Sequence, residues 1–257
     1  MENKTLGFIG GGRITRIILQ AFSNKNVEFD SISVFDPDME VSSRLKNHFP
    51  EIKIAGSNSE PAAQDIVFLA VHPPVILGIL KEISYAVREE AIIISLAPKI
   101  TVEKILSVIP SGKIIRMIPN ATTYINRGYN PVFFRDIFSN KEEKALMKFF
   151  NSVGKTFKVK EEELEAYAIV SAMLPTYFWF QWKKMEDIAV KTGLTEAESR
   201  NIIMATLSRA IELYYESGLS PDDVIDLIPV KPIGEQEKDI ETILETKLMA
   251  LFEKIKP

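Results

Sequence analysis

Short apolar runs alternate with amphipathic segments of helix length over the first part of the chain. Seven runs have strand length and composition: Thr5–Ile9, Ile32–Phe35, Ile66–Val71, Ala91–Leu96, Lys113–Met117, Pro131–Phe134 and Thr156–Val159. Several are continuously apolar, as expected for parallel strands that helices cover on both faces. Helices are predicted between them, at Arg13–Phe22, Glu40–His48, Pro74–Tyr85 and Lys141–Val153, the last opened by the capping pair Ser139 and Glu142. The alternation predicts an α/β fold, a Rossmann-type doubly wound parallel sheet with right-handed crossovers.

After Val159 the strand signal ends and helical periodicity continues. A capping box at Thr195 and Glu198 begins a helix that Gly218 ends, and Ser220 with Pro221 begins a further short helix. The final segment, from Glu235 to Lys254, is predicted to be an amphipathic helix. We therefore expect a boundary near Lys160. Residues 1–160 are predicted to form an α/β domain and residues 161–257 an all-helical domain.

The stretch from Ala166 to Trp182 is apolar and carries no charge. It is shorter than the roughly 18 to 20 apolar residues of a membrane span, and it contains Pro175 and Gln181. It is predicted to be a helix buried in a core or a subunit interface. Because the apolar helices here exceed what one helical layer buries, we expect a homodimer or higher oligomer and no membrane contact.

Composition narrows the function classes. The chain has 257 residues, of which 46% are hydrophobic and 26% charged, with a net charge of −4 that argues against a nucleic-acid partner. It has no cysteine, which excludes disulfides, thiolate metal sites and a cysteine nucleophile. His48 and His72 are its only histidines, so we expect no metal site. The N-terminus shows no secretory signal, and a cytoplasmic location is predicted.

A glycine-rich turn, GFIGGGRIT at residues 7–15, joins the first strand to the first helix. In that context Gly10 permits a tight turn, Gly12 lets the backbone approach a pyrophosphate, and the N–H groups of the helix start hold the anion. Thr15 departs from the glycine or alanine usual at the third position. The predicted cofactor-binding residues of this turn are Gly10, Gly11, Gly12, Arg13 and Ile14.

Asp36 ends the second strand, 24 positions beyond Gly12. A carboxylate at this place accepts a hydrogen bond from a ribose 2′-hydroxyl and repels a 2′-phosphate. Weighed against the nearby cations Arg13 and Arg44, it favours NAD over NADP. The alternative is that Asp36 only caps the following helix.

The order of further motifs resembles the pyrroline-5-carboxylate reductase family, within the 6-phosphogluconate-dehydrogenase-like group. Beside the glycine turn, similar to that family's GFIGxGxM, the matching segments are Ala70–Pro74 (family AVKPQ), Ser95–Ile100 (family SxAAGI), Arg116–Thr122 (family RxMPNTP) and Ser171–Tyr177 (family SGSGPAY). The resemblance covers essentially the whole chain. It implies a dinucleotide-binding domain at residues 1–160 and a dimerisation and substrate domain at residues 161–257, which forms an interlocked dimer. It also implies hydride transfer from a reduced nicotinamide to the C=N carbon of pyrroline-5-carboxylate, giving proline.

The resemblance also implies roles for single residues. Next to the cofactor it places Val71, His72, Pro73, Ala97 and Asn120. Asn120 is alternatively a turn residue that satisfies local backbone. As candidates for the substrate pocket and its chemistry it leaves Thr176, Tyr177 and Lys231. For the first two the alternative is a place in a core or interface, and for the third a solvated loop.

The chain departs from the family at both substrate motifs. In the first, both glycines and a serine are replaced by Ala172, Met173 and Leu174; in the second, the family's SPGGTT, threonines are replaced by Glu235 and Gln236. One alternative is therefore a nucleotide-binding homologue without turnover, acting as a sensor or partner subunit. Another is a dehydrogenase or reductase for a β-hydroxy acid or a deazaflavin, but the lysine that the former would need early in the helical domain is missing from 161–177.

Overall fold

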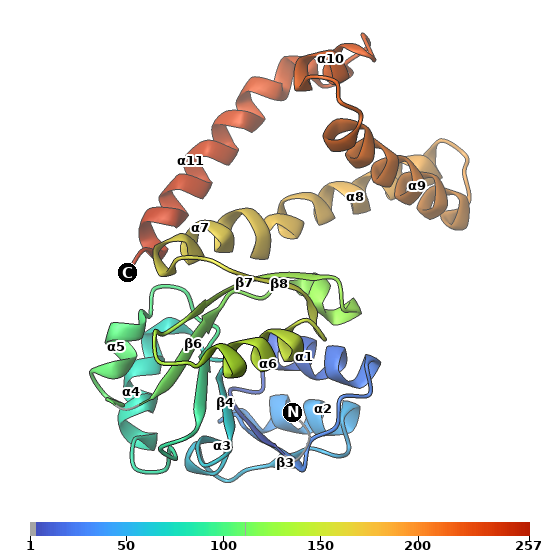
Figure 1. The fold of residues 1–257 in the computed structure, drawn as a ribbon. Helices are drawn as coiled ribbons and strands as arrows, with labels where there is room; N and C mark the ends of the chain where they lie inside the picture. Colours follow the sequence, from blue (N-terminus) through green and yellow to red (C-terminus); the bar gives the residue numbers. More distant parts are fainter. Residues whose placement is uncertain (1–3, 111) are drawn as a thin grey trace. The chain divides into compact units, whose positions relative to one another are not determined.

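The computed structural model describes residues 4–110 and 112–257, and its first part is an eight-stranded sheet (Figure 1). The strands are β1 (Thr5–Ile9), β2 (Ser31–Phe35), β3 (Lys53–Ile54), β4 (Ile66–Leu69), β5 (Ile92–Ser95), β6 (Lys113–Met117), β7 (Gly128–Phe134) and β8 (Gly154–Lys158). Their order is β3-β2-β1-β4-β5-β6-β7-β8. All neighbours pair parallel except β6 and β7, which are antiparallel.

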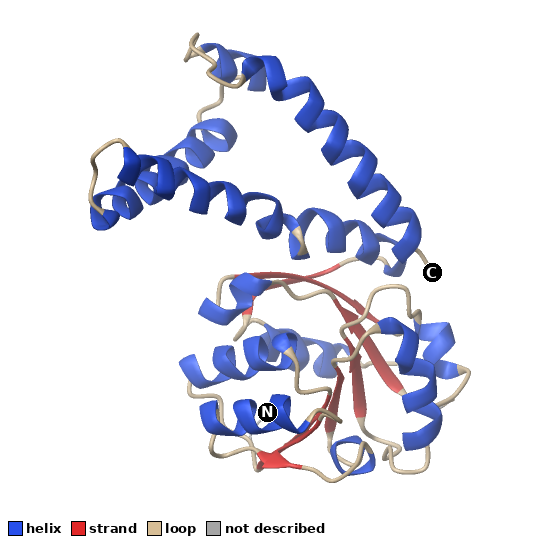
Figure 2. Ribbon diagram, turned by 180° about the vertical axis from the view of Figure 1, so that it is seen from behind, coloured by secondary structure: helices blue, strands red, loops and turns tan. Residues whose placement is uncertain are grey.

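Helices cover both faces of this sheet (Figures 1 and 2). They are α1 (Arg13–Asn24), α2 (Met39–His48), α3 (Ser59–Ala62), α4 (Pro73–Ile83), α5 (Val102–Leu106) and α6 (Asn140–Phe150), with a 3₁₀ turn, η1 (Ala121–Ile125). Side chains of α1, α2 and α6 share one buried apolar cluster with the sheet, and side chains of α4 and α5 share another. The predicted fold class is confirmed.

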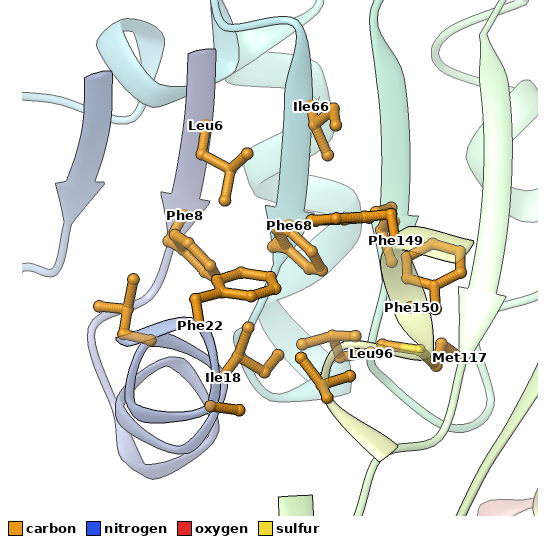
Figure 3. Close-up of a cluster of buried hydrophobic side chains, with 14 of the residues drawn as sticks. Leu6, Phe8, Ile18, Phe22, Ile66, Phe68, Leu96, Met117, Phe149 and Phe150 are labelled. Atoms are coloured by element: carbon orange, nitrogen blue, oxygen red, sulfur yellow. The ribbon is translucent and has the colours of Figure 1, made fainter. Parts of the chain in front are cut away.

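Side-chain alternation along the strands creates the two clusters. Leu6 and Phe8 of β1 face the α1 side, whereas Ile9 belongs to the opposite cluster. On the α1 side Phe8 stacks on Phe68 of β4 with ring centroids 4.7 Å apart (Figure 3). This packing fixes the end of β1, where the glycine turn begins.

All seven predicted strands are present, but two features of the sheet were not foreseen. β3 has only two residues, too few for a periodic signal. The second is that β7 runs antiparallel to β6 within the otherwise parallel sheet, because a parallel connection needs a crossover of a dozen or more residues. The link from Met117 to Gly128 holds only a short 3₁₀ turn, so the chain reverses, and α6 then provides the crossover to a parallel β8.

Two compact units make up the chain: Met1–Met173 with Leu251–Pro257, and Leu174–Ala250. The division falls later than the boundary predicted near Lys160. The first unit therefore includes η2 (Glu161–Glu163), α7 (Leu164–Tyr167) and a π-helical segment, η3 (Ala168–Ala172).

The second unit is all helical, as predicted. It contains α8 (Leu174–Lys191), α9 (Glu196–Glu216), α10 (Pro221–Asp226), η4 (Gly234–Gln236) and most of α11 (Glu237–Ile255). The predicted capping box at Thr195 and the predicted cap at Ser220, followed by Pro221 at the first helical position, are present. Among the described helices, none combines the length and the apolar composition needed to cross a bilayer.

Candidate functional site: a cleft at the carboxyl ends of the strands

A cleft of about 750 Å³ lies over the loops that follow β1, β4, β5 and β6. The chain leaves β1 toward β2 on one side and enters β4 on the other, and ligands of doubly wound sheets bind at such a switch point. The lining residues are Gly11, Gly12, Arg13, Ile14, Arg16, Val41, Arg44, Leu45, His48, Ala70, Val71, His72, Pro73, Leu96, Ala97, Pro98 and Pro119. Its volume lies within the range of small-molecule sites.

The glycine turn lines this cleft with residues 11–14. The Gly10 N–H donates to the Phe35 carbonyl at 2.8 Å, and with φ at +99° a side chain at Gly10 would be strained and would meet the Ala70 carbonyl oxygen at 2.6 Å. Gly12 is the N-cap of α1 and supplies no side-chain cap. A Cβ there would meet no atom within 4 Å, so its place is open. The first N–H groups of α1 thus face a cradle suited to an anion.

Thr15 has a role that explains its departure from the glycine pattern. Its side chain is fully buried, and its hydroxyl donates to the Gly10 carbonyl at 2.6 Å. The hydroxyl satisfies an acceptor of the tight turn, and the position tolerates a side chain larger than glycine or alanine.

Asp36 binds the turn itself. One carboxylate oxygen accepts the Gly11 N–H at 2.8 Å and the other accepts the Asp38 N–H at 2.9 Å. Asp36 is not among the described residues that line the cleft. The helix cap is instead Asp38, whose side chain accepts from the second and third residues of α2.

Four basic side chains of the helices α1 and α2 line the same cleft, two from each helix. They are Arg13, Arg16, Arg44 and His48. Arg13 and Arg44 were expected near the nucleotide from the sequence, whereas Arg16 and His48 were not. The spacing could have indicated His48, because Arg44 and His48 are four positions apart and therefore share one face of a helix.

The other predicted cofactor residues divide into two groups. Val71, His72, Pro73 and Ala97 line the cleft. Asn120 is buried beside it as the N-cap of η1, where its Oδ1 accepts from the Thr122 backbone and hydroxyl. This is the local turn role that was the alternative for Asn120. Its amide also donates to the Ser171 hydroxyl at 3.3 Å, which connects η1 to η3 within the first unit.

The three residues predicted for catalysis all belong to the second unit. Thr176 and Tyr177 lie on α8, and burial raises the pKa of the Tyr177 phenol, which keeps it protonated. Lys231 is exposed in the segment between α10 and η4. Their roles stay predictions. Among the described residues no group of three metal-ligating side chains is placed to hold a metal ion.

Comparison with known proteins supports the resemblance seen in the sequence. A family model described as "NADP oxidoreductase coenzyme F420-dependent" matches residues 5–99. The pyrroline-5-carboxylate reductase of Escherichia coli is 26% identical over 231 residues, 89% of this chain and 85% of the relative. Pyrroline-5-carboxylate reductase 3 of Danio rerio is 28% identical over 85% of this chain and 76% of the relative.

A solved structure has the same fold as this chain. The pyrroline carboxylate reductase of Plasmodium falciparum, with NADP bound, superposes with a TM-score of 0.83. It is 23% identical and covers 100% of this chain and 98% of that one. The match extends over both units and thus accounts for the order of sheet and helices along the whole chain.

Proposed function

We infer that this chain, a divergent relative of the pyrroline-5-carboxylate reductases, is an NAD(P)-dependent oxidoreductase. The observation that carries this inference is the open place at Gly12, at the start of α1 on a cleft of about 750 Å³. The reaction proposed is hydride transfer to the C=N bond of a small cyclic imino acid, giving proline or an analogue. The similarity of both units to such reductases does not favour a non-catalytic sensor.

The chain's own residues have distinct parts in this proposal. Backbone N–H groups at Gly12 and Arg13 hold the pyrophosphate, while His72 and Ala97 border the rest of the nucleotide. The bound reduced nicotinamide supplies the hydride. Tyr177, whose phenol is protonated, is the proposed hydrogen-bond donor to the imine nitrogen.

Its substrate pocket differs from the family pattern. At the place of the SGSGP turn, the Met173 N–H donates to the Ala168 carbonyl at 3.1 Å inside the π-helical turn. This N–H is therefore engaged in the helix and not offered to a substrate carboxylate. Thr176 and Lys231 remain the proposed polar groups for that carboxylate. Because this segment differs from the family motif, we propose either pyrroline-5-carboxylate or an analogue of it as the substrate.

The nucleotide preference follows from the charges of the cleft. The sequence favours NAD because of Asp36, yet both oxygens of that carboxylate already accept backbone N–H groups. Arg13 and Arg44 line the cleft, and guanidinium groups bind phosphate well. These contacts support a revised proposal, that NADP(H) is preferred through its 2′-phosphate.

A dimer is proposed from the surface of the second unit. Of residues 174–250, all of them described, only Ser199 is buried, while Phe178, Trp179 and Phe180 are 42%, 46% and 68% exposed. A helical unit without an apolar core does not offset the entropy of its own ordering. We propose that a second copy of the chain covers these side chains. A monomer in sedimentation equilibrium would contradict this proposal. The cytoplasmic location stays a prediction.

A fluorescence experiment tests the function. The protein is titrated with NADPH and with NADH, and pyrroline-5-carboxylate is then added while the nucleotide signal and proline formation are followed. Saturable binding with proline-forming decay is expected. Binding without decay, across a panel of cyclic imines, keto acids and a deazaflavin, would reject the imine reductase, and no binding of either nucleotide would reject the cofactor site.

A further inference from the structure

Arg116 is a charged side chain in the protein interior that the proposed hydride transfer does not use. It lies on β6 and is fully buried. Its Nη1 donates to Glu161 at 3.0 Å and its Nη2 donates to Glu165 at 2.6 Å. Glu165, on α7, is 1% exposed. Because burying two charges is costly, and apolar pairs often replace them without loss of stability, stability alone does not explain this pair.

The hydrogen bonding of the pair is also incomplete. Nε of Arg116 and Oε2 of Glu165 are buried, and among the described residues neither has a hydrogen-bond partner. Buried polar atoms are almost always satisfied, so each exception needs an explanation. The arrangement is therefore not the one that would maximise stability. An explanation for it comes from the other groups to which the two carboxylates are hydrogen-bonded.

Both carboxylates also hold the backbone that follows β5. Oε1 of Glu165 accepts the Lys99 N–H at 2.9 Å, and Oε1 of Glu161 accepts the Val102 N–H at 2.7 Å. The Lys99 carbonyl in turn accepts from the Lys104 side chain at 3.2 Å. The short segment between β5 and α5 is thus held at its middle, Lys99, and where α5 begins, Val102, by two carboxylates that follow β8.

Lys99 is the strained residue of this segment. Its φ is +72°, in the left-handed region that the Cβ of an ordinary residue makes unfavourable. Such a conformation persists only where surrounding contacts hold it. The three residues before it, Leu96, Ala97 and Pro98, line the nucleotide cleft. The conformation at Lys99 therefore sets the course of one wall of that cleft.

We propose that Glu165, oriented by Arg116, is a positioning residue that holds Lys99 left-handed and thereby keeps Leu96–Pro98 in the shape that binds the nucleotide. This inference rests on the proposed function, because it concerns the same cleft. It assigns the buried ion pair to cofactor binding and not to catalysis by contact. It also ties the nucleotide cleft to α7, the first helix after the sheet.

The test uses a residue that adopts the left-handed conformation freely. NADPH dissociation constants are measured by fluorescence for the full chain as wild type, Glu165→Ala, Glu165→Ala with Lys99→Gly, and Glu165→Ala with Lys99→Ala. If loss of the carboxylate leaves about one molecule in ten with the competent loop, Glu165→Ala weakens binding about tenfold. Lys99→Gly is expected to restore most of this affinity, because glycine needs no support at positive φ. Lys99→Ala, the matched control, is expected not to.

Three results would count against the reasoning in different ways. Folded Glu165→Ala protein with wild-type affinity, or equal behaviour of the glycine and alanine variants, would overturn the positioning role. If Glu165→Ala does not fold, the pair Arg116→Met with Glu165→Met removes both charges at similar volume and is taken through the same comparison at Lys99. Wild-type protein that binds neither NADPH nor NADH would overturn the proposed function, and this inference with it.

Discussion

Replacing Gly12 by alanine is expected to weaken nucleotide binding with little effect on folding, which the other glycines of the turn do not allow. A Cβ at Gly12 meets no atom within 4 Å, and the residue's φ of −70° and ψ of −161° are open to alanine. The methyl group would instead occupy the cradle into which the pyrophosphate must come. Gly10→Ala lacks this separation, since a Cβ there meets the Ala70 carbonyl oxygen.

The magnitudes follow from the same geometry. Alanine is a poorer N-cap than glycine, so the expected loss of folding free energy is about 0.5–1 kcal/mol. An added methyl in a close contact costs about 1–3 kcal/mol, which weakens nucleotide binding about 5- to 150-fold. The expected lowering of the melting temperature is only a few degrees, about 2–4 °C per kcal/mol for a chain of this size.

Fluorescence titration with NADPH measures the binding, and thermal unfolding measures the stability. Gly78→Ala is the control, because Gly78 lies in α4 and a Cβ there also meets nothing within 4 Å. It is expected to gain about 0.5–1 kcal/mol of stability and to keep its affinity for the nucleotide. Wild-type affinity in Gly12→Ala would refute the assignment of this turn to the pyrophosphate.

Three further predictions test the turn, the cleft and the capping of α6. Thr15→Val removes a buried hydroxyl that donates to a carbonyl at 2.6 Å and is expected to cost about 1–3 kcal/mol in urea unfolding; a change below about 0.5 kcal/mol contradicts this. Arg44→Ala is expected to weaken NADPH binding about tenfold and NADH binding little, and equal losses would count against a 2′-phosphate contact. Hydrogen bonds from Ser139, with Lys113 nearby, lower the pKa of Glu142 from 4.5 to about 2, so its stabilisation is present above pH 4.5 and is lost as the pH falls toward 2. Since this side chain is 41% exposed, Glu142→Gln should flatten that part of the stability profile by only about 1 kcal/mol, and an unchanged acid slope would refute the contribution.

The sequence was informative wherever a signal is local. Short apolar runs located seven strands, several of them continuously apolar because parallel strands covered on both faces bury most of their side chains. Capping pairs located the starts of α6 and α9, since a capping box joins residues three positions apart, and a serine cap followed by proline located the start of α10. The glycine turn was recognisable for the same reason, as its special residues follow one another directly. The motif order along the chain then indicated the reductase relatives that the comparisons support.

What depends on contacts between distant residues was decided only by the tertiary structure. The direction of β7 follows from a connection too short for a crossover, and the apolar pattern of a strand is the same in either direction. The carboxylate of Asp36 is engaged by the backbone of Gly11, 25 positions away, a contact that its residue type alone does not reveal. Arg116 stands in an apolar strand, and its partners lie 45 and 49 positions further along the chain. No periodicity connects such groups, because folding, and not spacing along the chain, brings them within a hydrogen bond of one another.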